Sequence, residues 1–199
     1  MTRLLNQSVA TGQWFHSSDA QPWWFDSGSL ALDFAYTGGM GEAGRWEQLR
    51  GASDLLEWLG QRYAHVAEAT DRDLADALTL RAAIASLAQA ASDGAEPQAD
   101  DIDTVNLFAA TPDIPPAIEG GHRQAGRSRV RTGQVLSTIA RDAVQLLAHN
   151  DDGRIRECSA DDCQLVFYDE SRTNNRRWCS MQRCGNRAKV KAFRAREKS

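Results

Sequence analysis

Four cysteines constrain this chain more than any other feature, because all of them lie in the last 42 residues. They are Cys158, Cys163, Cys179 and Cys184, spaced C-x4-C-x15-C-x4-C. Two close pairs separated by a hairpin-sized spacer are typical of a four-thiolate zinc site. Disulfides and an iron–sulfur cluster are the alternatives. A reducing compartment disfavours disulfides, and the surrounding arginines and short spacer favour zinc over a cluster. We therefore expect one structural Zn²⁺ ion.

The spacing also predicts how this segment folds. Residues 165–167 are apolar, 173–175 form a polar turn and 176–178 follow, which predicts strand, turn and strand. Residues five apart on an α-helix point about 140° away from each other. Cys179 should therefore precede a helix, and Cys184 should lie in its first turn. A segment of about 45 residues has little core of its own, so zinc would stabilise this treble clef, by roughly 10–16 kcal/mol.

Charge divides the chain at the same place. The net charge is −4, yet residues 154–199 carry 12 Lys and Arg against 6 Asp and Glu, whereas residues 1–153 carry 11 against 21. An acidic body with a basic module indicates a polyanionic partner for the module. We expect DNA, with RNA or another protein as alternatives, because treble clefs serve all three. The candidate contacts are Arg172, Arg176, Arg177, Arg183, Asn186, Arg187, Lys189, Lys191, Arg194 and Arg196.

Some of these residues have a structural alternative. Arg177, Arg183 and Arg187 could instead offset the charge of −2 that four thiolates leave on a zinc ion. Asn186 could read adenine, or it could cap the turn next to Gly185. Lys191, Arg194 and Arg196 are too far along the predicted helix to serve the metal.

Residues 1–152 read as a mostly helical domain, and residues 153–199 as the finger. Helices are predicted from Ser53 or Asp54 to Val66, from Thr70 to the breaker SDGAEPQ, over Ile102 to Phe108, and over 132–150. A capping box of Thr70 and Asp73 begins the second helix. The apolar stripes of the first, second and fourth helices are Leu55, Leu59, Tyr63 and Val66; Leu74, Leu78, Ile84 and Leu87; and Val135, Ile139, Ala143 and Leu146. The third helix carries Ile102, Val105 and Phe108.

Three further segments of this domain are less regular. Residues 30–34 fit either a short strand or a helix, and glycine turns in 117–130 predict a hairpin. The aromatic cluster of Trp14, Phe15, Trp23, Trp24 and Phe25 is expected to cover the core rather than to form a stacking surface. The predicted class is α+β.

Two motifs resemble known families. CGNRAK at 184–189, with WCS at 178–180, is similar to the CGNR zinc finger, and LALDFAYT at 30–37 resembles the LxLDFxNT stretch that opens the ABATE domain. The resemblance implies a stress-responsive transcription regulator with a DNA-contacting finger. It also implies a small-ligand site in the body, for which we expect Asp33, Phe34, Tyr36 and Thr37. Tyr36 departs from the family pattern, which tends to have Asn there.

We expect no enzyme activity. None of the four histidines lies in the finger, and four cysteines on one zinc leave no open coordination position. Asp33 is interpreted as a buried, hydrogen-bonded carboxylate rather than a catalytic acid. A start without an apolar signal region and the lack of an apolar run of about 18 residues predict a cytoplasmic protein without a membrane span. The oligomeric state stays open, with a homodimer among the alternatives.

Overall fold

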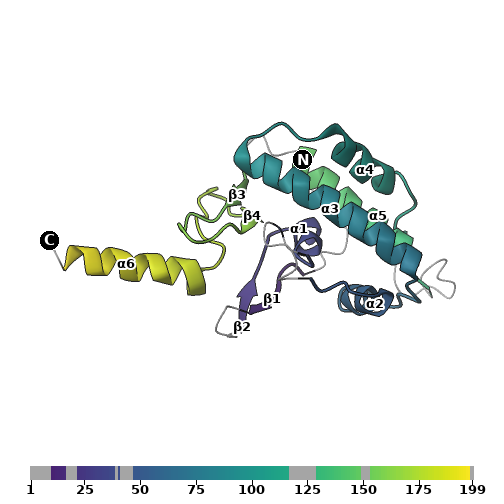
Figure 1. Cartoon of the computed structure of the whole chain (residues 1–199), viewed down its shortest axis with the longest axis horizontal. Helices are drawn as coiled ribbons and strands as arrows, with labels where there is room; N and C mark the ends of the chain where they lie inside the picture. The colour runs from purple at the N-terminus through teal and green to yellow at the C-terminus, as the bar shows by residue number, and fades with distance from the viewer. Residues whose placement is uncertain are drawn as a thin grey trace.

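Three long helices form the main layer of the protein. The structure is a computed structural model, and it describes residues 10–16, 22–38, 40, 47–116, 129–148 and 153–197. Helices α3 (Asp71–Asp93), α4 (Ala99–Ala109) and α5 (Thr132–Ala148) pack against one another (Figure 1). The short helix α1 (Leu30–Ala35) packs on α3 and α5, and α2 (Ala52–Gly60) contacts the same two helices.

Two small antiparallel sheets accompany the helices. Strands β1 (Gln13–His16) and β2 (Pro22–Phe25) form one, and β3 (Ile155–Glu157) and β4 (Val166–Tyr168) form the other. A π-helical turn, η2 (Met181–Gly185), leads into the last helix, α6 (Asn186–Arg196), which extends away from the rest of the molecule (Figure 1). The predicted α+β class is confirmed.

The helices with the clearest local signals agree with their predictions. The Thr70 hydroxyl accepts the Asp73 N–H at 3.2 Å, and the Asp73 carboxylate accepts the Thr70 N–H at 2.8 Å, so the predicted capping box begins α3. Gly94 ends α3 with φ +66°. The predicted apolar stripe of α5 (Val135, Ile139, Ala143 and Leu146) is buried.

The prediction for the first long helix is wrong at both ends. Helix α2 ends at Gly60 instead of continuing to Val66, and His65 adopts φ +67°, which breaks any helix there. Val66 instead bridges Val130. At its start the cap is Gly51, whose N–H donates to the Asp54 carboxylate at 3.1 Å. In α4, Val105 is buried, whereas Ile102 is 38% exposed.

The segment left open between strand and helix, residues 30–34, is helical. The Asp142 carboxylate of α5 accepts the Ser29 hydroxyl at 2.7 Å and the Ala31 N–H at 2.9 Å. This long-range cap satisfies the start of α1, and it explains why the local sequence did not decide between the two structures. Residues 117–128, most of the predicted hairpin 117–130, lie outside the described residues.

The N-terminal aromatic cluster divides between the two faces of the β1–β2 hairpin. Phe15, Trp23 and Phe25 are buried in the core, as expected for all five rings. Trp14 and Trp24 are 62% and 41% exposed, so the prediction is wrong for this pair. Side chains alternate across a strand, and this alternation places the two tryptophans opposite each other on the outer face.

The finger pairs its strands differently from the prediction. The predicted strand near 165–167 exists as β4, but it pairs with β3, which precedes the first cysteine. Residues 176–178 form no strand. They belong to a loop organised by the buried Asp169, whose carboxylate accepts the Ser171 N–H at 2.9 Å and the Arg176 N–H at 2.7 Å. These bonds take the backbone groups that a strand partner would need.

Finger and helical body share one hydrophobic core. Ile155, Val166 and Phe167 of the finger are buried in the same cluster as Leu32 and Leu80 of the body. Helix α3 packs directly on β3 and β4. Among the described residues, no helix has the length and apolarity to cross a membrane.

Candidate metal centre and nucleic-acid surface

The four cysteines converge on one point. Their sulfurs all lie within 4.8 Å of one another, with Cys163 Sγ to Cys179 Sγ at 3.7 Å and Cys179 Sγ to Cys184 Sγ at 3.4 Å. A tetrahedral zinc with Zn–S bonds of about 2.3 Å requires sulfurs about 3.8 Å apart. Cys158, Cys179 and Cys184 are buried and Cys163 is half-buried. The chain is therefore positioned to bind one zinc ion, as predicted.

Two local structures deliver these sulfurs. The connection between β3 and β4 carries Cys158 and Cys163, and the Cys179 N–H donates to Cys158 Sγ at 3.3 Å. Cys179 precedes the helical segment and Cys184 lies in η2, whose Gly185 N–H reaches back to the Ser180 carbonyl at 3.1 Å. Because Cys179 lies before the helical segment, after an extended Ser180, two cysteines five residues apart can face one metal, which they could not do within a single α-helix. The predicted order of the second pair relative to the helix is confirmed, whereas the treble clef stays a prediction.

The tetrapeptide Cys184 to Arg187 has a physical role at each position. Gly185 leaves room, because a Cβ there would lie 2.7 Å from Met181 Sδ and 3.2 Å from Trp178 Cδ1. The Asn186 amide donates to the Gln182 carbonyl at 3.3 Å and so caps the turn. Arg187 donates to Cys184 Sγ at 3.2 Å and binds both oxygens of Asp162 at 2.7 and 3.0 Å.

Arg187 thus fits the structural alternative given for the arginines, namely to offset thiolate charge. Its partners Cys184 and Asp162 raise the pKa of its guanidinium. Arg177 and Arg183 instead lie over the rings of Trp178 and Trp23, at 5.1 and 4.6 Å from the ring centroids.

Arg176, predicted to contact DNA, holds the finger to the body. Its Nη2 donates to the carbonyls of Asp26 and Cys179, both at 2.7 Å, and its guanidinium lies 4.1 Å above the Phe167 ring. Burial lowers the pKa of this guanidinium. The composition around the cysteines could not distinguish this arginine from its exposed neighbours, because its partner Asp26 lies 150 residues away in the sequence.

Tyr36 makes a second link between body and finger. Its hydroxyl donates to the Val166 carbonyl at 2.9 Å and accepts the Val166 N–H at 2.7 Å, so it completes the backbone hydrogen bonding of β4. Burial raises the pKa of this phenol. No sequence pattern marked this contact.

The other residues predicted for a ligand site are also buried and bonded within the protein. The Asp33 carboxylate accepts the Ser27 hydroxyl and the Gly12 N–H, both at 2.6 Å, and burial raises the pKa of Asp33 to about 6. The Thr37 hydroxyl donates to the Phe34 carbonyl at 2.7 Å. The ligand role of all four stays a prediction, while Asp33 has the buried, hydrogen-bonded position interpreted from the sequence.

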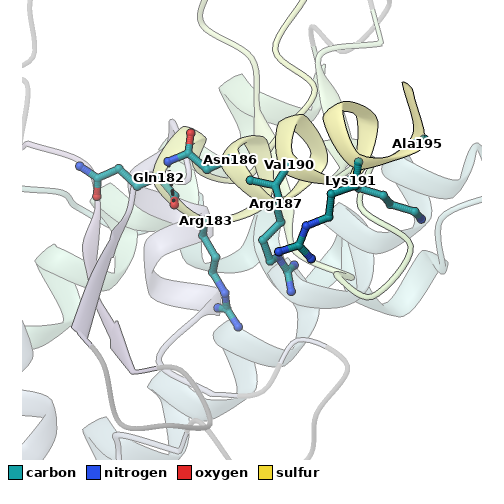
Figure 2. A pocket seen from close by; sticks show the side chains of 8 residues that line it. Gln182, Arg183, Asn186, Arg187, Val190, Lys191 and Ala195 are labelled. Carbon is teal, nitrogen blue, oxygen red and sulfur yellow. Dashed lines mark hydrogen bonds between the residues drawn. The ribbon is translucent and has the colours of Figure 1, made fainter. Parts of the chain in front are cut away.

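The remaining basic residues lie on the outside of the finger. An open hollow of about 820 Å³ runs along α6, and Figure 2 shows Arg183 and Arg187 extending from the same side of the helix toward it. Lys191 reaches the Asp161 carboxylate at 2.7 Å. Within the described part of the finger, the other exposed cations are Arg172, Arg177, Lys189, Arg194 and Arg196.

A helical body that carries a basic zinc finger with four cysteine ligands is the class of protein that this fold and site define. The chain belongs to the ABATE family, described as "Putative stress-induced transcription regulator", which matches residues 28–150. Residues 154–197 match the CGNR zinc finger. Both families inferred from the two motifs are confirmed, in the expected order. No curated protein matches the chain. The predicted boundary between 152 and 153 stays a prediction.

Proposed function

We propose that this protein is a transcription regulator that binds duplex DNA through α6, with the zinc ion fixing the start of that helix. The observation that carries the proposal is the helix itself. It has five basic and no acidic residues, none of its side chains is buried, and it extends away from the acidic body (Figure 1). A positive rod of this kind suits a phosphate backbone, and an α-helix fits the DNA major groove.

The cations of α6 are not equivalent. Lys189, Arg194 and Arg196 are exposed and have no ion-pair partner within the described part of the chain. Arg187 and Lys191 are already paired, with Asp162 and Asp161. Three unpaired cations, each neutralising one phosphate, predict a slope of about −3 for log affinity against log salt, from about −0.9 per phosphate.

The start of α6 is the part best suited to read bases. Recognition helices contact base edges mainly with their N-terminal residues. Arg183 and Asn186 line the hollow beside the first turns (Figure 2). The cations further along would then set affinity rather than sequence preference.

A salt titration of DNA binding tests the proposal. Arg194→Ala should weaken binding to all duplexes by a similar factor and flatten the salt slope by about one unit. Arg72→Ala is the matched control, because Arg72 is an exposed arginine on α3 of the body. Wild type that shows no salt-dependent DNA binding, or that binds structured RNA more tightly than duplex DNA, contradicts the proposal.

The alternative of a protein-interaction finger has one specific observation in its favour. Val190 and Phe193 of α6 are 48% and 55% exposed, which is unusual for apolar side chains on a helix that contacts only phosphates. If the protein binds no nucleic acid, the protein-interaction finger is the alternative that remains.

Three further predictions remain part of the proposal, although no contact in the described residues supports them. These are a small ligand at Asp33, Phe34, Tyr36 and Thr37, a homodimer, and the absence of enzyme activity. For the ligand, the protein's own hydrogen bonds already occupy the hydroxyl of Tyr36 and the carboxylate of Asp33.

A further inference from the structure

Two tryptophans face outward from a hairpin in which Phe15, Trp23 and Phe25 are buried. Trp14 and Trp24 lie directly opposite on β1 and β2, and their rings meet edge to face with centroids 5.4 Å apart. They are 62% and 41% exposed. Most tryptophans are largely buried, and their burial stabilises the fold. An exposed apolar patch of this kind often marks a binding surface.

The ring of Trp24 is held in a fixed place by Gly12. A Cβ on Gly12 would lie 2.5 Å from Trp24 Cζ2, so only glycine lets the backbone pass under the indole. Gly12 also has φ +100°, which favours glycine. Its N–H is bonded to the buried Asp33 carboxylate, so the support under the ring is tied to the core. A ring fixed in advance loses little entropy on binding.

A hollow of about 510 Å³ lies beside Trp24, at the junction of body and finger. Trp24 and Asp26 line it from the body, and residues 175–181 line it from the finger. The finger contributes the exposed Asn175 and Arg177 and the half-buried Trp178. An indole, a guanidinium and an amide are the groups that stack on and hydrogen-bond to a nucleobase.

The hollow adjoins the basic surface of the finger along the chain, because Met181 lines it and the next residues, Gln182 and Arg183, line the hollow along α6. Trp23, next to Trp24 on β2, has its ring under the Arg183 guanidinium, and Arg183 in turn lines the hollow along α6. A nucleic acid whose phosphates follow α6 therefore passes close to the hairpin.

We propose that Trp24, with Arg177 and Trp178, forms a stacking site for one unpaired nucleobase beside the phosphate-binding helix. The inference rests on the proposed nucleic-acid function and deepens it, because it names an unpaired base as part of the ligand. An apolar peptide or a second copy of the acidic chain would match the indole but would bring no phosphate to the cations of the finger. A base offers a ring face and polar edges to the Arg177 guanidinium and the Asn175 amide, and its phosphate complements the cations nearby.

The test compares one duplex with the same duplex carrying a single extrahelical thymine. Wild type should bind the bulged duplex roughly 10-fold more tightly, since stacking on an aromatic side chain changes affinity by about that factor. Trp24→Ala should abolish this preference and leave binding to the paired duplex unchanged. Trp24→Phe, which keeps a ring, should retain part of the preference.

Two controls separate this inference from the proposed function. Leu107→Ala removes another exposed apolar side chain, on α4, and should change nothing. Arg194→Ala should weaken both duplexes equally. Binding without a preference for the bulge, or a preference that survives Trp24→Ala, overturns the stacking site alone. A Trp24→Ala variant that changes only the sedimentation of the protein also overturns it, in favour of a contact between copies. Absence of all nucleic-acid binding overturns the proposed function and the stacking site together.

Discussion

At the scale of single residues, two side chains link the body and the finger, one from each part. Tyr36 reaches from the body to the backbone of β4, and Arg176 reaches from the finger to the Asp26 carbonyl. Tyr36 occupies the position at which the family-like motif tends to have Asn. Its longer side chain lets a residue just after α1 satisfy both backbone groups of Val166, 130 residues away.

Tyr36→Phe is therefore expected to destabilise the protein. The substitution keeps the ring but leaves the buried Val166 N–H and carbonyl without their partner, which costs about 1–3 kcal/mol. Equilibrium unfolding by denaturant measures the loss. Tyr168→Phe is the matched control, because the Tyr168 hydroxyl makes no hydrogen bond within the part of the chain that the structure describes. Equal stability of the two variants would show that the Tyr36 hydroxyl does not hold the finger.

At the scale of elements, the described contacts of α6 with the rest of the finger are concentrated at its start. The π-turn, the Asn186 cap and the Arg187 contacts fix the first turns next to the sulfurs. Further along, Lys191 and Asp161 form a surface ion pair that links α6 to the rest of the finger. Asp161 thus lies where a DNA phosphate would approach the helix, and it competes for the same cation.

Asp161→Asn should consequently strengthen DNA binding. It releases Lys191 for a phosphate and removes one repelling charge, so we expect a gain of about two- to fivefold at low salt and a salt slope steeper by up to about one unit. Asp103→Asn on α4 makes the same change of net charge at an exposed site on the body. If both variants bind equally well, net charge rather than the release of Lys191 accounts for the effect.

The elements also show what local sequence can and cannot determine. Helices α3 and α5 could be predicted, because their caps and apolar stripes are encoded within a few residues. The zinc ligands could be predicted for the same reason, since cysteine spacing is local. The pairing of β4 with β3, the cap of α1 by Asp142 and the role of Arg176 depend on partners distant in sequence, which a pattern of single residues does not contain.

At the scale of the whole molecule, the metal site and the helical body are one packed structure. Phe167 and Cys158 belong to the same buried cluster as α1 and α3, and α3 contacts both strands of the finger. The finger's own core is small, so the body supplies much of what it packs against. The reverse also holds, because Val166 and Phe167 cover apolar surface of the body that water would otherwise reach.

Loss of zinc should therefore destabilise the helical body and not the finger alone. Structural zinc contributes roughly 10–16 kcal/mol of apparent free energy in small fingers. In a chain of this size each kcal/mol changes the melting temperature by about 2–4 °C. If about 3 kcal/mol of this free energy stabilises the body by way of the shared core, the melting temperature of the body should fall by about 6–12 °C without zinc. Circular dichroism at 222 nm measures it, because α3 and α5 dominate the helical signal. Chelated wild type should recover when zinc is added back, whereas Cys179→Ser should not. A body transition that is unchanged while the finger has lost its metal would show that the two parts are stabilised independently.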